Sequence, residues 1–295
     1  MLKCGDVIRI NSYEDIEKII ESLKLNWKEE SYKFYFRGQA VDKWRLLPGM
    51  LRSKIDEKAQ IEEDKTTDTI SVKMAAAQHY GKKTRCLDFT RNMDIALYFA
   101  VRDKEYENED GALYILWYYP HDPDWFTNYL MHYISTSNKS ILDKYAIEKF
   151  AMDKSILDDD KVYDYVLASY LLEKKRILSE FYRTGRSTEL SDAKMEINHY
   201  LSNGFLVDFK GKECGIERLK KQEGALYYFG SQYYYNSSKI IDNNIRFSNS
   251  ISYKINIHEL IDHKLEERCI KIVIPKEIKQ EIYKKINITN KDLSL

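Results

Sequence analysis

The chain has 295 residues, of which 43% are hydrophobic and 24 are tyrosines, so it can build a core and is not a disordered chain. Its 47 basic and 47 acidic residues give a net charge of zero, which argues against a protein that wraps nucleic acid by bulk electrostatics. The four cysteines are scattered, and the N-terminal segment lacks an apolar signal core. We therefore expect reduced thiols and a cytoplasmic protein with no membrane span.

The first part of the chain alternates between periodic and turn-like segments. SYEDIEKIIESL has Ser12 at an N-cap position and spaces its isoleucines for one apolar face, which predicts a helix. KFYFRG predicts a short aromatic strand that ends at Gly38. Residues 44–52 predict a loop, because a Pro-Gly pair interrupts them. From about residue 56 to residue 80 we expect a helix, with Gly81 as its C-cap.

The second part begins with a strand-like TRCLDFT and an apolar helix over residues 92–102. GALYILWYY, at residues 111–119, predicts a strand in the centre of a sheet. Residues 120–186 change character and indicate a helical insertion or cap. Strand patterns return in GFLVDF, GALYYFG, ISYKINI and CIKIVI, and a helix follows from Pro275.

Together these elements predict a single α+β domain over residues 1–295, with a mixed or antiparallel sheet and a helical insertion at 120–186. The insertion could be an oligomerisation surface that makes a homo-oligomer, a lid, or a target-recognition segment. The histidines lack zinc-ligand spacing, and neither a GxGxxG nor a Walker loop occurs. We therefore expect no metal.

Polar residues interrupt the predicted strand TRCLDFT. Alternation puts Thr84, Cys86, Asp88 and Thr90 on one face, and Arg85, Leu87 and Phe89 on the other. A buried Asp88 needs a partner or a ligand, and Arg37 is the natural counter-charge. Alternatively, Asp88 or Thr90 caps the following helix; we favour the cap for Thr90 and a site role for Asp88. We expect Arg37 and Asp88 to form an ion pair or to face one cleft, with His79 at its rim.

Two further segments carry candidate site residues. The Arg37 guanidinium could clamp a pyrophosphate, with Gly38 letting the backbone approach the ligand, or it could form a structural salt bridge. Gln78 and His79 come at a predicted helix end. His79 is either a base or ligand-orienting donor, or a histidine that satisfies the last helix carbonyls. No serine or cysteine nucleophile stands beside it, which argues against a hydrolytic triad.

Three segments, FYFRGQ, WRLLPGMLR and AAAQHYGKKTRCLDFTRNMDIALYFA, closely resemble the FRG domain, a bacterial family named for its Phe-Arg-Gly motif. ERLKKQEGALYYFG and CIKIVIPKEIKQEIYKKINIT are similar to the later parts of that family. Members often occur as defence or toxin-like proteins. The order of motifs also resembles the ADP-ribosyltransferase plan, which implies NAD as the substrate and a fold of that kind.

The resemblance implies roles for particular residues. Glu223 becomes the late acid that stabilises an oxocarbenium-like state as nicotinamide leaves, although a solvated turn or a larger role for Gln222 would also fit. The implied catalytic residues are Arg37, Asp88 and Glu223. The implied NAD-binding residues are Gly38, Gln78, His79, Thr84, Arg85 and Thr90.

Two function classes therefore stay open. The first is an NAD-consuming transferase or glycohydrolase that acts as a toxin or anti-phage effector on a macromolecular target. The second is a non-catalytic sensor that holds a nucleotide or a phage component in the same pocket. Nucleic-acid processing is disfavoured by the charge balance.

Overall fold

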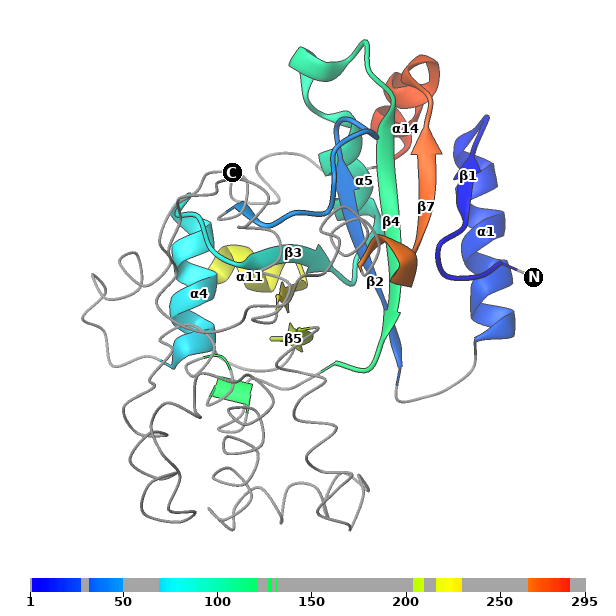
Figure 1. Cartoon of the computed structure of the whole chain (residues 1–295). Helices are drawn as coiled ribbons and strands as arrows, with labels where there is room; N and C mark the ends of the chain where they lie inside the picture. The colour runs from blue at the N-terminus through cyan, green and yellow to red at the C-terminus, as the bar shows by residue number, and fades with distance from the viewer. Residues whose placement is uncertain are drawn as a thin grey trace, which may run out of the picture.

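The structure is a computed structural model, and it describes residues 2–27, 32–49, 69–120, 127, 128, 131, 204–209, 216–229 and 265–286. The strands of this part of the chain form one seven-stranded sheet (Figure 1). They are β1 (Val7–Arg9), β2 (Lys33–Gln39), β3 (Cys86–Thr90), β4 (Gly111–Tyr118), β5 (Phe205–Asp208), β6 (Gly224–Tyr228) and β7 (Cys269–Ile274).

The strand order is β1-β7-β4-β2-β3-β6-β5. Neighbouring strands are antiparallel except β1 and β7, which run parallel. This confirms the predicted α+β class with a mixed sheet, and β4 is flanked on both sides as expected. β1 is a strand that the sequence pattern does not predict, because three residues are too few for a periodic signal. The strand expected from ISYKINI lies outside the described residues.

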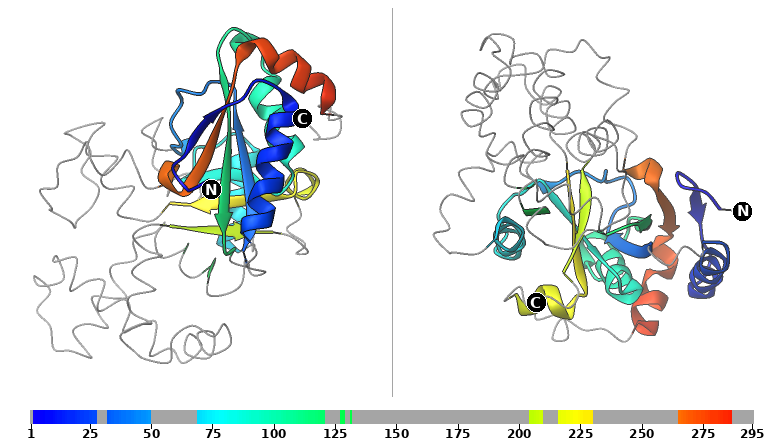
Figure 2. Two further views of the ribbon diagram at one scale, coloured as in Figure 1. Left: turned by 90° about the vertical axis from the view of Figure 1, so that its right-hand side faces the viewer. Right: turned by 90° about the horizontal axis from the view of Figure 1, so that it is seen from below.

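β2 joins two halves of the sheet. It pairs with β4 along all seven of its residues, but with β3 only where Phe36 lies opposite Thr90. β3 pairs along its whole length with β6, which in turn pairs with β5. Beyond Phe36 the strands β2 and β3 separate, and Figures 1 and 2 show β3 running across the direction of β2 and β4. The backbone at this divergence loses ladder partners, which other groups must replace.

The helices described lie mainly beside the β1-β7-β4-β2 half and around β3 and β6 (Figure 1). The α-helices are α1 (Tyr13–Asn26), α4 (Ile70–His79), α5 (Met93–Val101), α11 (Glu217–Lys221) and α14 (Lys279–Lys285). The 3-10 helices are η1 (Lys104–Tyr106), η3 (Glu266–Arg268) and η4 (Lys276–Ile278). None of these helices is long and apolar enough to cross a lipid bilayer.

Helix α1 forms as its sequence predicts. Its N-cap is Ser12, whose backbone N–H donates to the Asp15 carboxylate at 3.2 Å, as in a capping box. Ile16, Ile20 and Leu23 are buried on one face. The C-terminal helical segment also follows Pro275 as expected, as η4 and then α14.

Helix α5 packs directly against β2. A Cβ atom added to Gly38 would lie 1.7 Å from the Ala96 carbonyl oxygen, so the glycine is required for this close approach. The N-cap of α5 is Asn92, whose side chain accepts from the backbone N–H of Asp94 at 3.0 Å and of Ile95 at 3.4 Å. The preference for Thr90 as the cap was therefore wrong.

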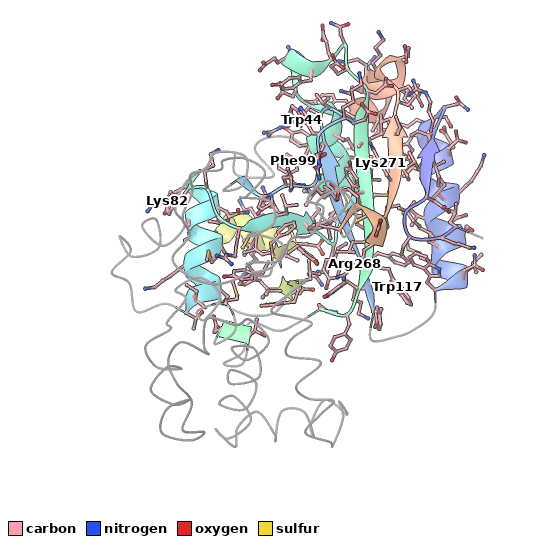
Figure 3. All side chains as sticks on the ribbon, in the orientation of Figure 1. Trp44, Lys82, Phe99, Trp117, Arg268 and Lys271 are labelled. Atoms are coloured by element: carbon pink, nitrogen blue, oxygen red, sulfur yellow. The ribbon has the colours of Figure 1, made fainter. Side chains whose placement is uncertain are left out.

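Two hydrophobic clusters lie on opposite faces of the sheet, and side chains fill the space on both sides (Figure 3). One cluster joins α1, α5 and α14 to the face of β2, β4 and β7 that includes Phe36. The other includes Tyr35 of β2, Leu87 and Phe89 of β3, and Tyr227 of β6. Neighbouring residues of β2 thus serve different clusters, as strand alternation requires.

Parts of two predictions cannot be compared with the structure. The predicted helix of residues 56–80 is observed as α4 from Ile70 onward; Thr69 is an N-cap with extended backbone, so the expectation of one continuous helix was wrong, and residues 56–68 lie outside the described residues. The expected helical insertion at residues 120–186 lies outside the described residues except for 120, 127, 128 and 131.

Candidate functional site

The polar face of β3 has the alternation that the sequence predicts. Leu87 and Phe89 are buried in the Tyr35 cluster, whereas Asp88 is the one exposed residue of the strand. The expected separation of Asp88 from these two residues is confirmed, but the expectation that Asp88 is buried was wrong, because its side chain is exposed. The Asp88 carboxylate therefore lies next to solvent, where it carries little desolvation cost.

Asp88 is held by the last turn of α4. Gln78 Nε2 donates to Asp88 Oδ1 at 2.5 Å, and the Thr84 hydroxyl donates to Gln78 Oε1. The Thr84 hydroxyl oxygen also accepts from the Cys86 N–H at 3.2 Å. Gly81 has a φ of 75°, which ends the helix and turns the chain back toward β3. The predicted site residues Gln78, Thr84 and Asp88 thus form one hydrogen-bonded chain.

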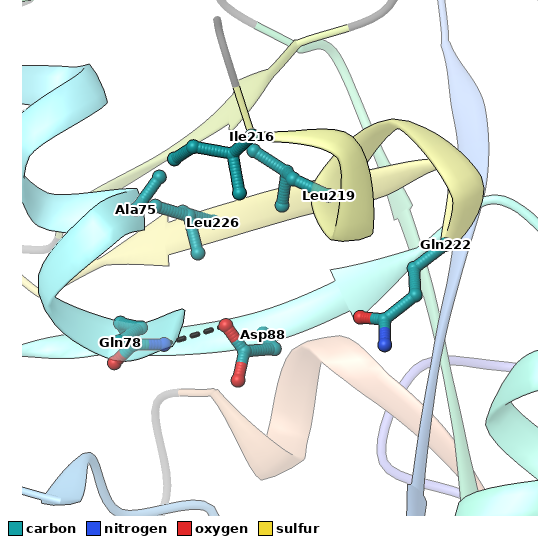
Figure 4. Close-up of a pocket in the computed structure, with 7 residues that line it drawn as sticks. All are labelled: Ala75, Gln78, Asp88, Ile216, Leu219, Gln222 and Leu226. Atoms are coloured by element: carbon teal, nitrogen blue, oxygen red, sulfur yellow. Dashed lines mark hydrogen bonds between the residues drawn. The ribbon is translucent and has the colours of Figure 1, made fainter. Parts of the chain in front are cut away.

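Asp88 lines a small open pocket, which we call the Asp88 pocket (Figure 4). Its polar lining residues are Gln78, Asp88 and Gln222. Its apolar lining residues are Ala75, Ile216, Leu219 and Leu226. In Figure 4 the three polar side chains lie along one side of the pocket and the apolar ones along the other. A few polar groups over an apolar wall are typical of a ligand site.

Gln222 enters this pocket from the turn between α11 and β6. Its backbone carbonyl accepts a hydrogen bond from the Thr90 hydroxyl at 2.5 Å. Its side-chain Nε2 is buried and donates to no other group among the residues that the structure describes. A buried amide N–H without an acceptor costs about 1–3 kcal/mol, which a bound ligand or water could recover. Gln222, which the sequence suggested only as an alternative to its neighbour, is therefore a pocket residue.

Glu223 has a different role in the structure. It is a non-glycine residue with a φ of 46°, and its carboxylate lies 3.5 Å from Arg91 Nη2. Its backbone carbonyl accepts from the Arg91 N–H at 3.1 Å. It does not line the Asp88 pocket. The structure thus places Glu223 beside a cation of the protein rather than beside Asp88.

Arg37 reaches β3, but not as an ion pair on a shared face. Its Nη1 donates to the backbone carbonyl of Asp88 at 2.7 Å. Arg37 follows Phe36, which shares a face with Thr90 and hence with Asp88. The Arg37 and Asp88 side chains therefore leave their strands on opposite faces, and the expectation of one shared cleft was wrong. The guanidinium instead satisfies a carbonyl where β2 and β3 separate.

Arg37 also belongs to a row of side chains across the face opposite α5. It lies opposite Tyr114 of β4, which lies opposite Lys271 of β7. Burial raises the pKa of Tyr114, whose hydroxyl donates to the Trp44 carbonyl at 3.4 Å. Lys271 Nζ lies 5.7 Å from the Tyr114 ring centroid and donates to the Asp42 carbonyl at 2.6 Å. Tyr114 and Lys271 thus bond to protein groups.

The other residues predicted for the site mainly contact groups of the protein itself. Gly38 allows the close approach of helix α5, and it does not line the Asp88 pocket. Arg85 is buried, with its guanidinium carbon 5.5 Å from the Tyr228 ring centroid. Thr90 bonds to the Gln222 carbonyl and accepts from the Asn92 N–H at 3.0 Å. The side chain of His79 lies outside the described part of the chain. Among the residues described, no group of three or more His, Cys, Asp or Glu could hold a metal ion.

Comparison with known proteins finds one family model that matches part of the chain. Residues 32–109 match the family model of the FRG domain, which confirms the resemblance over β2, α4, β3 and α5. Gln222 and Glu223 lie beyond the matched range. No curated protein and no solved structure matches the chain.

Proposed function

We propose that this chain, which contains an FRG domain, binds NAD in the Asp88 pocket and cleaves it as an ADP-ribosyltransferase-like toxin or anti-phage effector. The observation that carries the proposal is the exposed Asp88 carboxylate, fixed by Gln78 and facing the same pocket as the buried amide of Gln222. A few convergent polar groups beside an apolar wall are the default hypothesis for a ligand site.

The two polar ends of the pocket define the ligand chemistry that fits. Asp88 accepts hydrogen bonds, and among the described residues only Gln78 donates to its carboxylate. Gln222 Nε2 needs an acceptor. A planar group that offers an N–H or O–H at one edge and a lone pair at another, such as a carboxamide, an adenine edge or a ribose diol, satisfies both. The apolar wall suits the face of a ring.

The proposed reaction is cleavage of the bond between nicotinamide and ribose. The C–N bond breaks, its electron pair leaves with nicotinamide, and positive charge develops on the ribose carbon and ring oxygen. The Asp88 carboxylate stabilises that charge, because a fixed anion in a partly enclosed site acts more strongly than one in water. A nucleophile, water or a target side chain, then adds to the ribose carbon and loses its proton.

A second function, a binding module without turnover, is favoured by a separate observation. Two of the three residues expected to be catalytic do not line the pocket: Arg37 donates to the Asp88 carbonyl, and Glu223 pairs with Arg91. A pocket left with one carboxylate and two amides can hold a nucleotide or a phage component and signal its presence.

Nicotinamide release tests the enzymatic proposal. Purified protein is incubated with NAD, with and without cell lysate, and nicotinamide is measured by chromatography. We expect release by the wild type and by a control, Glu17→Gln, whose side chain is exposed on α1. We expect Asp88→Asn to lower the rate about 10²-fold, the size expected for removal of a charge-stabilising group. Equal rates for Asp88→Asn and the wild type would contradict the proposed role.

Thermal unfolding separates the two functions. If NAD raises the melting temperature of the wild type but not of Asp88→Asn, and no nicotinamide forms in any lysate, the binding module is correct. If NAD neither shifts the melting temperature nor is cleaved, both proposals for NAD are wrong, and the ligand must be sought among other nucleotides and phage components.

A further inference from the structure

The turn that brings Gln222 into the pocket is fastened to the end of β3 by its backbone. The Thr90 hydroxyl donates to the Gln222 carbonyl at 2.5 Å, and the Arg91 N–H donates to the Glu223 carbonyl at 3.1 Å. The Glu223 N–H donates to the Lys220 carbonyl at 3.1 Å. These bonds hold the turn although Glu223 adopts a left-handed φ of 46°, which ordinary side chains avoid.

The Arg91 side chain makes a second set of contacts with the same turn. Its Nη2 lies 3.5 Å from Glu223 Oε2, and its Nε lies 3.5 Å from Asp208 Oδ2 on β5. The Arg91 and Asp208 side chains are only 15% and 11% exposed, so their attraction is screened little by water. One guanidinium thus bridges the turn and the edge strand.

Asp208 is itself anchored in the core. The buried hydroxyl of Tyr35 on β2 donates to Asp208 Oδ2 at 2.8 Å. A continuous path of contacts therefore runs from β2 through Tyr35, Asp208 and Arg91 to Glu223, directly next to Gln222. The path crosses the divergence between β2 and β3, where the two strands share one residue pair.

We propose that Arg91 is a positioning residue that fixes the 222–223 turn, so that the Gln222 amide stays in the Asp88 pocket. Glu223 then acts through Arg91, not on the ligand. The conformational part of this inference stands alone. Its ligand part rests on the proposed function, because it assumes that NAD contacts Gln222.

Hydrogen–deuterium exchange tests the conformational part without any ligand. We expect Arg91→Gln to raise exchange of the amides in residues 217–224 about tenfold and to leave β4 unchanged, because only the local opening of the turn becomes easier. Arg102→Gln, the same substitution at the other end of α5, is the matched control. If Arg91→Gln does not fold, Arg91→Lys keeps a cation but loses the two-sided fork. Wild-type exchange at 217–224 in a folded Arg91 variant would overturn the proposal.

A double-mutant cycle with NAD as the probe tests the ligand part. We expect Arg91→Gln to weaken NAD binding about tenfold in the wild type and to add nothing in a Gln222→Ala background, because both changes act on one amide. Glu223→Gln should weaken binding less, by about threefold, since Arg91 keeps Asp208. Losses of NAD affinity that add fully in the double variant would show that Arg91 does not act through Gln222.

The two failures are distinguishable. Absence of NAD binding by the wild type would refute the proposed function and the ligand part, while the exchange experiment still decides whether Arg91 holds the turn. Loosening of the turn without any effect of Arg91→Gln on NAD affinity would limit Arg91 to a structural role and refute its positioning of a ligand group.

Discussion

Residues 36–38 and residues 84–90 lie on neighbouring strands and both carry FRG-domain motifs, but the structure uses them in opposite ways. The first segment is built into the scaffold: Phe36 is buried, Arg37 caps the Asp88 carbonyl, and Gly38 admits α5. In the second segment Asp88 is the exposed residue of β3, and it meets Gln78 beside a pocket.

A charged residue within a family motif therefore need not contact a ligand. Arg37 stands where two strands separate, and an unpaired carbonyl there requires a donor. Asp88 stands on a strand whose apolar residues already fill the opposite face, so its carboxylate can remain exposed. Variants of Arg37 and Gly38 should thus reduce stability, and variants of Asp88 should reduce ligand chemistry.

The largest effect is expected for Gly38→Ala. The added methyl would lie 1.7 Å from the Ala96 carbonyl oxygen and 2.8 Å from the Ala100 nitrogen, and helix backbone cannot move aside locally. We expect a loss of about 3 kcal/mol or more in unfolding free energy, measured by urea denaturation. Gly49→Ala is the control, since its nearest contact, at 3.1 Å, is a carbon of the flexible Lys83 side chain. Equal stability of the two variants would break the scaffold interpretation of residues 36–38.

The next effect separates Arg37 from Asp88. Arg37→Met should cost about 1–3 kcal/mol of unfolding free energy, because the Asp88 carbonyl loses its donor. Asp88→Asn should change stability by about 0.5 kcal/mol or less, since the residue is exposed and an asparagine oxygen can still accept from Gln78. A reversed order of the two losses would show that the carboxylate, not the arginine, supports the fold.

Thr90→Val tests the contact between the end of β3 and the turn that carries Gln222. The hydroxyl donates to the Gln222 carbonyl and accepts from the Asn92 N–H, so its removal leaves both without that partner. We expect a loss of about 1–2 kcal/mol in unfolding free energy. Thr90→Ser keeps the hydroxyl and should remain near the wild type. Similar losses in both variants would mean that packing of the methyl group matters more than these bonds.

The smallest effect is expected for Asp110, next to β4, and concerns the loss of folding stability at acid pH. A hydrogen bond from Arg9 at 2.6 Å lowers the pKa of Asp110, and the Lys276 N–H donates to the same carboxylate. A lowered folded pKa gives stability that is present above about pH 4, the ordinary aspartate range, and is lost as the pH falls through the folded pKa. Asp110→Asn should slightly reduce stability at pH 7 and flatten its fall below pH 4, unlike the exposed control Glu107→Gln. An unchanged acid profile would contradict this.

Most of the described fold could be predicted because its signals are local. The cap of α1, the apolar run of β4 and the strand patterns of β5, β6 and β7 are written in adjacent residues. The divergence of β2 and β3 could not be predicted, since register depends on partners far apart in the chain. A finer fold assignment than an α+β class with a mixed sheet, such as the ADP-ribosyltransferase fold, depends on the same long-range register and stays a proposal.

The site was predictable to the extent that it depends on one strand. Alternation along TRCLDFT correctly separated Asp88 from Leu87 and Phe89. The partner of Arg37 was missed because it is a backbone carbonyl, which residue types do not reveal. The apolar wall was missed because Leu226 meets Asp88 only through the pairing of β3 with β6. The contact between Arg91 and Asp208 was missed because the two residues lie far apart in the chain, with Asp208 on β5.

Calorimetric titration of NAD into wild type, Asp88→Asn and Arg37→Met tests most directly whether the Asp88 pocket binds the ligand. We expect Asp88→Asn to keep the wild-type melting temperature and lose at least about tenfold in affinity, since a hydrogen bond to a charged group contributes about 1.5–3 kcal/mol. We expect Arg37→Met to melt at a lower temperature and to bind NAD with wild-type affinity once folded. Wild-type affinity in Asp88→Asn, together with lost affinity in folded Arg37→Met, would place the ligand on the other face of the sheet and contradict the proposed site.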